Sequence, residues 1–62
     1  MLIIKIKTGN EAFTDGQTGW EVARILKDAA RFCENGLVHG DEKRLLDLNG
    51  NKVGTLTFRE DK

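Results

Sequence analysis

The segment from Leu45 to Phe58 constrains the fold of this chain more than any other part of the sequence. Two runs rich in apolar and β-branched residues are separated by the tripeptide Asn49-Gly50-Asn51. Gly adopts positive φ freely and Asn tolerates it better than most residues, so an Asn-Gly turn between two such runs is typical of a β-hairpin. The segment therefore predicts two antiparallel strands, in a hairpin that extends from about Arg44 to Arg59.

The second strand of this hairpin has an irregular apolar pattern. Val53 and Leu56 lie three positions apart, and a regular strand would turn their side chains to opposite faces. Gly54 lies between them, and an isolated Gly inside a strand often marks a β-bulge. We therefore predict a bulge at Gly54 and expect both Val53 and Leu56 to face the core.

The segment 2–8 is predicted to form another strand, because its residues alternate and Ile favours strands. The residues expected to face the core are Leu2, Ile4 and Ile6. The residues expected on the opposite face are Ile3, Lys5 and Lys7. Ile3 is the one large apolar residue on this second face, which the alternation predicts to be solvated.

An amphipathic helix is predicted to begin at Thr18 and to end before Gly36. Thr18 and Glu21 match the capping box S/T-x-x-E, in which each side chain bonds the backbone amide of the other residue. Asn35-Gly36 is typical of a left-handed helix stop. An apolar stripe at helical spacing is expected to face the sheet, and it consists of Val22, Ile25, Leu26, Ala29 and Cys33.

The order of these elements predicts an α+β fold, with a single β-α-β-β domain over residues 1–62. One amphipathic helix would pack on one face of a three-stranded, mainly antiparallel sheet, with the last strand in the centre. Phe13, in the loop 9–19, is too large to leave in water and is expected to fold back onto the helix or the sheet edge. A chain this short buries only about 60% of its unfolded surface, so we weigh a homodimer and a monomer equally.

Composition and charge narrow the classes of partner. The chain carries ten acidic and ten basic side chains and has no net charge, so it lacks the strong basic footprint of a nucleic-acid-binding protein. Its N-terminal apolar run is too short for a signal peptide, and no segment has the length of a membrane span. With one free cysteine, which is compatible with a reducing compartment, we expect a cytoplasmic protein with no membrane partner.

Cys33 and His39 are the only cysteine and histidine. As nucleophile and base they would still need an orienting group and an oxyanion site, and structural zinc needs four ligands. Cys33 lies on the apolar stripe, where a free cysteine behaves as a small hydrophobe. Four acidic residues are expected to be solvated, namely Asp15, Asp41, Glu42 and Asp47. We therefore predict a protein that is not an enzyme, with no catalytic, cofactor-binding or metal-binding residues.

The sheet face that the helix leaves uncovered is the predicted partner-binding surface. Its predicted residues are Ile3, Lys5, Lys7 and Leu46. An apolar patch on such a face marks a protein partner or a dimer contact. The alternative is a small nucleic-acid-binding module on a basic sheet face that includes Lys52 and Arg59. We expect nucleic acid to be an unlikely partner, because such faces stack bases on aromatic residues and Phe58 is the only strand aromatic.

Three segments carry a resemblance to known proteins: Thr8-Gly9-Asn10-Glu11-Ala12-Phe13, Glu21-Val22-Ala23-Arg24-Ile25-Leu26, and the run from Leu45 to Gly54. Through them the chain resembles a group of small proteins, mostly without an assigned role, that phages, prophages and other mobile elements encode. The resemblance implies an origin on a mobile element. It also implies a protein-interaction role, which in some proteins of this kind is the inhibition of a host defence system. It brings no catalytic motif and no functional residues.

Overall fold

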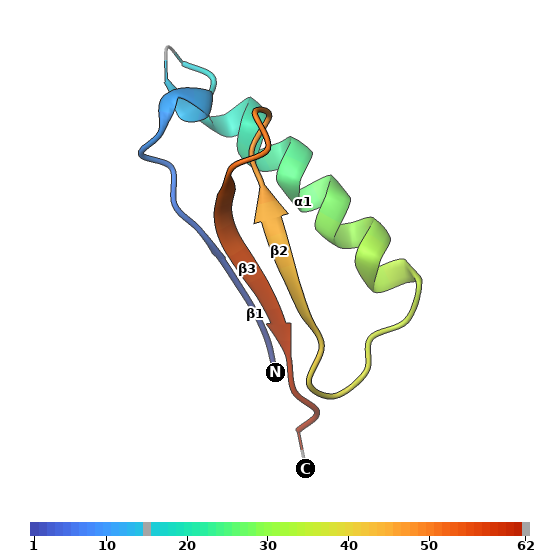
Figure 1. Cartoon of the computed structure of the whole chain (residues 1–62). Helices are drawn as coiled ribbons and strands as arrows, with labels where there is room; N and C mark the ends of the chain where they lie inside the picture. The colour runs from blue at the N-terminus through green and yellow to red at the C-terminus, as the bar shows by residue number, and fades with distance from the viewer. Residues whose placement is uncertain (15, 62) are drawn as a thin grey trace.

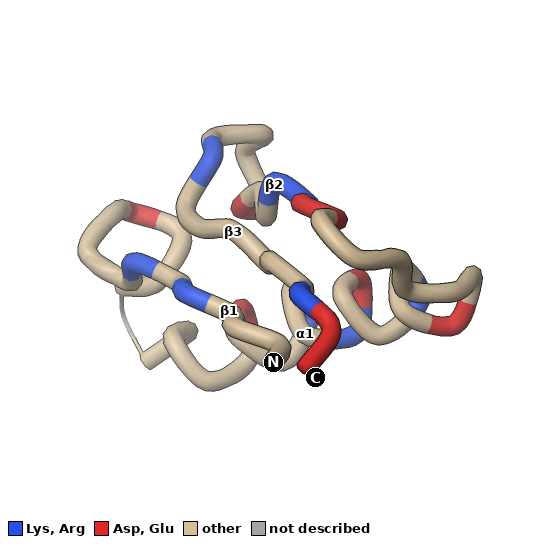
Figure 2. The backbone as a smooth tube through the Cα atoms, turned by 90° about the horizontal axis from the view of Figure 1, so that it is seen from below, with Lys and Arg blue, Asp and Glu red and all other residues tan. Residues whose placement is uncertain are grey.

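The computed structural model describes residues 1–14 and 16–61. Its elements are strand β1 (Leu2–Ile6), the short 3-10 helix η1 (Glu11–Phe13), helix α1 (Thr18–Glu34), and strands β2 (Glu42–Leu46) and β3 (Lys52–Phe58). The strands form one antiparallel sheet in the order β1-β3-β2. The helix lies along one face of this sheet (Figures 1 and 2). This confirms the predicted α+β fold with the last strand in the centre.

The helix does not cover the sheet evenly. It packs mainly against β2 and η1, and Figure 1 shows it on the β2 side, with β1 at the other edge. The buried cluster consists of Phe13, Ile25, Ala29, Leu45, Val53 and Leu56, so the prediction that Phe13 folds back is confirmed. The molecule is elongated, at 42 × 18 × 17 Å with a radius of gyration of 12.4 Å, whereas a compact chain of this length would have about 10.5 Å.

This placement of the helix overturns the prediction for β1. Leu2 and Ile4 do lie on the helix side of the sheet, because Ile4 pairs directly with the buried Leu56. Nevertheless both are exposed, and only Ile6 packs against the core. The physical reason is width: a helix is about 10 Å across, and of the three strands this helix approaches β2 most closely.

The hairpin turn lies at the predicted Asn49-Gly50 position. The Asp47 amide donates to the Asn51 carbonyl at 2.8 Å, and the Gly50 amide donates to the Asp47 carbonyl at 3.0 Å. These bonds define a three-residue loop, 48–50, which ends on a residue of positive φ. Gly50 has φ 84°, so the turn requires Gly at the position where the sequence predicted it.

The predicted bulge is present. Leu45 pairs with Gly54 while Leu46 pairs with Lys52, so Val53 is the extra residue of β3. Val53 and Leu56 are both buried, as the irregular pattern predicted.

The capping box is not formed. Thr18 is the first helical residue, and Gln17 is the N-cap without a side-chain bond. The Thr18 hydroxyl donates instead to the Phe13 carbonyl, and the Glu21 carboxylate turns toward the hairpin, where it has stronger partners.

The other end of the helix follows the prediction, since Gly36 adopts φ 101°. The apolar stripe is shifted from the expected one, because Leu26 is exposed and Phe32 packs against the core in its place.

Candidate interaction surface

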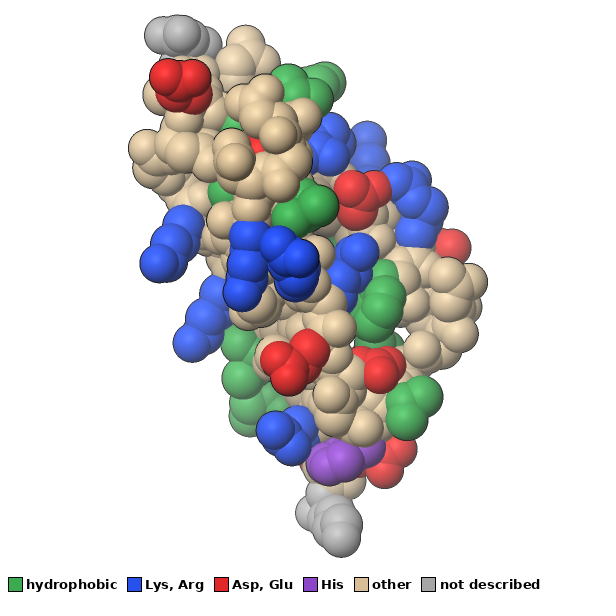
Figure 3. Space-filling view, in the orientation of Figure 1, with side chains coloured by type: hydrophobic (Ala, Val, Ile, Leu, Met, Phe, Trp, Pro, Cys, Tyr) green, Lys and Arg blue, Asp and Glu red, His purple; other side chains and the backbone are tan. Residues whose placement is uncertain are grey.

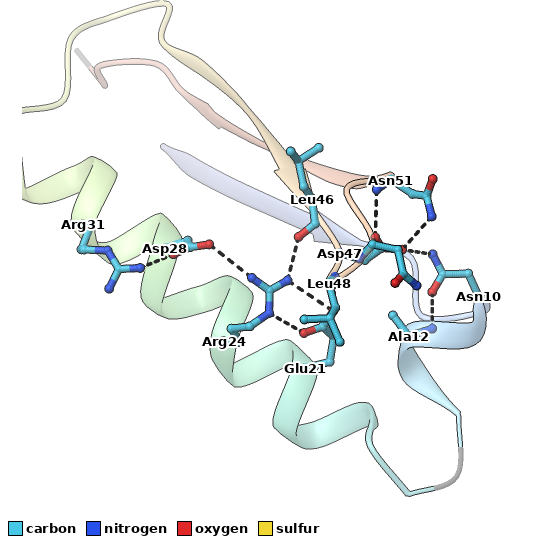
Figure 4. A network of polar contacts seen from close by, with 11 residues as sticks. Asn10, Ala12, Glu21, Arg24, Asp28, Arg31, Leu46, Asp47, Leu48 and Asn51 are labelled. Atoms are coloured by element: carbon cyan, nitrogen blue, oxygen red, sulfur yellow. Dashed lines mark hydrogen bonds and ion pairs between the residues drawn. The ribbon is translucent and has the colours of Figure 1, made fainter.

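Two carboxylates are buried at the hairpin end of the molecule, Glu21 at 1% exposure and Asp47 at 4%. Glu21 accepts from Arg24 through Nε at 2.6 Å and Nη2 at 3.2 Å, and from the Leu48 amide at 2.7 Å. The Arg24 Nη2 also donates to the Leu46 carbonyl at 3.0 Å. These bonds join helix α1 to the end of β2 and to the hairpin loop (Figure 4).

Asp47 is the centre of a second set of bonds. Its Oδ1 accepts from the amides of Asn49 at 2.9 Å and Asn51 at 2.8 Å. Its Oδ2 accepts from the side-chain amides of Asn10 at 2.7 Å and Asn51 at 3.3 Å. Asn10 also caps η1 by accepting from the Ala12 amide. Asp47 therefore fixes the hairpin loop and ties it to η1.

The surroundings of both carboxylates favour their charged forms. The hydrogen bond from Arg24 lowers the pKa of Glu21 below its ordinary value and outweighs the effect of burial. Burial by itself would raise the pKa of Asp47, but the combined hydrogen bonds from Asn51, Asn10 and Asn49 lower it. Both groups are thus ionised and held at neutral pH.

The hydrogen bonds of this network are complete within the chain. Among the described residues, every buried side-chain nitrogen or oxygen has a hydrogen-bond partner, so the network offers no free group to a ligand. The sequence prediction that Asp47 is solvated was therefore wrong. Glu42 is exposed as expected, Asp41 is partly buried and accepts from the Val38 amide at 2.9 Å, and Asp15 lies outside the described residues.

The structure brings together few groups with catalytic or metal-binding chemistry. Cys33 is partly buried against the core. His39 is exposed, and its Nδ1 accepts from the Glu60 amide at 3.1 Å. Within residues 1–14 and 16–61, no three His, Cys, Asp or Glu side chains gather as metal ligands. No helix in the same part of the chain is long and apolar enough to cross a membrane.

Strand β1 carries the most unusual surface. Leu2, Ile3 and Ile4 are 44%, 42% and 36% exposed, although they are consecutive large apolar residues. Ile4 lies on the helix side of the sheet and Ile3 on the open side, so β1 shows apolar side chains on both faces. Figure 3 shows hydrophobic side chains gathered along this edge, at the lower left.

The backbone of β1 is open along its outer side. The Arg59 amide donates to the Met1 carbonyl at 3.0 Å and the Lys7 amide donates to the Val53 carbonyl at 2.7 Å, which places the backbone groups of odd-numbered residues toward β3. In an antiparallel pair the bonded and non-bonded positions alternate. The residues whose N–H and C=O groups point outward are therefore Leu2, Ile4 and Ile6. In the described chain no strand pairs with that side.

The four residues predicted for partner binding do not form one patch. Ile3 pairs with Thr57 at one end of β3, and Leu46 pairs with Lys52 at the other, a separation of about 20 Å at ordinary strand spacings. All four are exposed. Sequence reasoning placed Ile3 correctly but missed that Leu2 and Ile4 belong to the same exposed strand.

Lys5 and Lys7 belong to a separate basic region. With Lys52 and Thr55 they line a shallow hollow of about 370 Å³ beside the bulge at Val53. Figure 3 shows basic side chains over the upper part of the sheet. This end of the sheet is polar and positively charged, whereas the Leu2–Ile4 end is apolar.

Comparisons with known proteins do not assign this chain to a family. The chain matches no protein family, no curated protein and no solved structure.

Proposed function

We propose that this chain is a small non-enzymatic protein-interaction module that binds its partner through β1. The observation that carries the proposal is the combination of exposed apolar side chains on both faces of β1 and outward backbone groups along its free edge. An exposed edge strand of this kind pairs readily with another chain. Main-chain hydrogen bonds then supply affinity, and side-chain contacts supply specificity.

The other edge of the sheet supports this choice of surface. Two of the β2 residues whose backbone groups point outward, Glu42 and Arg44, are charged, and charged edge residues discourage strand pairing. The Leu46 carbonyl at its end is already bonded to Arg24. Only one of the two edges is therefore suited to a partner strand.

The resemblance to proteins of phages and other mobile elements suggests a biological role for this binding. A small module with one binding edge and no cluster of reactive groups among its described residues acts by occupying a surface of another protein. In this form of the proposal, the chain inhibits a component of a host defence system by binding it.

A photo-crosslinking amino acid placed at position 3 tests the proposal. Ile3 is exposed on β1, and Val38 is an exposed apolar residue outside the sheet that serves as the matched control site. Irradiation in cells should give discrete covalent adducts from position 3 and none of the same size from position 38. Equal or absent adducts at the two positions would contradict binding through β1.

A second candidate function rests on the lysines of the bulge region. Lys5, Lys7 and Lys52 line one hollow, and three clustered positive charges can contact the phosphates of a nucleic acid. Gel shifts with single-stranded DNA and RNA test this candidate. It requires a shift that weakens steeply with salt and that disappears in a Lys5→Gln, Lys52→Gln variant. Binding whose affinity does not change with salt concentration would exclude nucleic-acid binding by these lysines.

A further inference from the structure

We infer that the partner strand on β1 is β1 of a second copy, aligned antiparallel and centred on Ile4. This inference rests on the proposed function, because it names the occupant of the same edge. A host protein bound to β1 is the alternative occupant, and the experiments below distinguish the two. Such pairing would join two three-stranded sheets into one continuous sheet, with the two helices on the same face. The argument comes from the directions of the backbone groups, the side chains that would face each other, and the placement of charge.

The backbone geometry restricts the possible alignments. A two-fold axis normal to the sheet must bring outward-facing residues of one copy opposite outward-facing residues of the other. Only the even-numbered residues Leu2, Ile4 and Ile6 face outward. An alignment centred on Ile4 pairs Leu2 with Ile6 of the second copy and Ile4 with Ile4. Every outward N–H and C=O group of these three residues then gains a partner, whereas centring on Ile3 leaves those of Ile6 free.

The side chains agree with this alignment. Residues directly opposite each other in an antiparallel pair share a face, so Leu2, Ile4 and Ile6 of the two copies would cover one another on the helix side. These are the side chains that the helix of their own copy fails to cover fully. The continuous sheet would thus bury the apolar surface that the single chain leaves open.

Charge is also arranged suitably. On the open face the alignment places Lys5 opposite Ile3 of the second copy, and Lys7 opposite Met1. No lysine of β1 lies directly opposite another lysine, so the repulsion of directly opposed like charges is absent, and the two copies of Lys5 are diagonal neighbours about 7–8 Å apart. By contrast, self-pairing of β2 centred on Arg44 would place Arg44 directly opposite Arg44 of the second copy.

Disulfide trapping tests the alignment directly. In a Cys33→Ser background, Ile4→Cys places the two sulfur-bearing residues directly opposite each other, at a Cα separation of about 5.5 Å, which a disulfide can span. Ile3→Cys is the matched control, because its two copies would be diagonal neighbours about 7–8 Å apart. Mild oxidation should trap a covalent dimer from Cys at position 4 and little from position 3. Trapping at position 3 alone, or at neither position, would overturn the inference.

Sedimentation provides the second measurement. At high concentration, sedimentation of the wild-type chain should give a molecular mass twice that of the monomer. Ile4→Lys would place two positive charges opposite each other, so the dimer dissociation constant should rise by at least about tenfold. Val38→Lys, the same change at an exposed site outside the sheet, should leave the dissociation constant unchanged. A wild type that stays monomeric at millimolar concentration would overturn the inference, whatever the fold of the variants.

The two proposals fail in different ways. If the wild type is monomeric but the position 3 probe captures another protein, binding through β1 stands and the second copy is excluded. If the position 3 probe gives no adduct beyond that of position 38, the proposed function itself is excluded.

Discussion

The two edge strands of the sheet, β1 and β2, differ in the residues whose backbone groups point outward. At the β2 edge the residues with outward backbone groups are Glu42, Arg44 and Leu46, where charge discourages pairing and Arg24 bonds the Leu46 carbonyl. At the β1 edge they are Leu2, Ile4 and Ile6, which are all apolar. Among the described residues no other strand pairs with this edge. This difference between the two edges is the basis of the proposal that a partner strand binds β1 and not β2.

The largest expected effect comes from Gly54, because β1 is held to the sheet through β3 alone. A Cβ at Gly54 would lie 1.9 Å from the Lys5 carbonyl oxygen, which is backbone and cannot move aside cheaply. Gly54→Ala should therefore destabilise the domain by about 3 kcal/mol. Gly9→Ala is the matched control, because nothing lies within 4 Å of its Cβ position. Urea unfolding measures both, and equal stability of the two variants would show that β1 does not approach β3 as described.

The next effect comes from Glu21, which helps to close the β2 edge. Glu21→Gln removes the charge that holds Arg24 against Glu21 and Leu46, and it should cost about 2 kcal/mol. This is less than the loss for a fully buried pair, because the Arg24 side chain is 30% exposed. Glu34→Gln, at the exposed end of the same helix, is the control and should be nearly neutral. Thermal melts of equal midpoint for the two variants would contradict a structural role for Glu21.

Low pH should destabilise the hairpin end of the molecule, where Glu21 and Asp47 are buried. Glu21 and Asp47 have folded-state pKa values below their ordinary values of 4.5 and 3.8. The folded state therefore binds fewer protons than the unfolded state in this range, and stability must fall as pH drops. The melting temperature should be flat above about pH 5, and it should decline from the ordinary values downward through the lowered ones. Glu21→Gln should show a shallower decline, and a parallel decline would indicate that other carboxylates dominate.

The smallest expected effect is at Thr18, which does not cap the helix. Its hydroxyl donates to the Phe13 carbonyl and orients the loop before the helix. Thr18→Ala should cost about 1 kcal/mol, the usual contribution of one hydrogen bond. Thr18→Ser keeps the donor and should recover most of the loss. A variant pair with identical melting temperatures would show that the hydroxyl is solvated.

The sequence predicted the fold well where a local pattern determines the structure. The bulge could be predicted because Val53 and Leu56 break the strand period around a glycine, and the helix stop because Asn35-Gly36 has one common use. The layering, with one helix on one face of the sheet, followed from the one-sided apolar patterns of the elements. These features depend on neighbours in the sequence, and they needed no knowledge of how the layers are offset.

The candidate site depended on features that no local pattern contains. The alternation of β1 placed Leu2 and Ile4 in the core, but whether a core exists there depends on where the helix lies across the sheet. The capping-box motif assigned Glu21 a local partner, whereas its real partners include Leu48, which is distant in the sequence. For Asp47 a signal was present, since an Asp two residues before Asn in a turn commonly bonds the turn amides.

Amide hydrogen exchange at increasing protein concentration tests the central claim most directly. If β1 pairs with a second copy, the amides of Leu2, Ile4 and Ile6 should exchange more slowly as concentration rises. The amides of Glu42 and Arg44, which face outward at the other edge, should exchange rapidly throughout. Those of Ile3 and Lys5 bond to β3 within one chain, so their exchange serves as the internal reference. Rapid, concentration-independent exchange at Leu2, Ile4 and Ile6 would contradict the account.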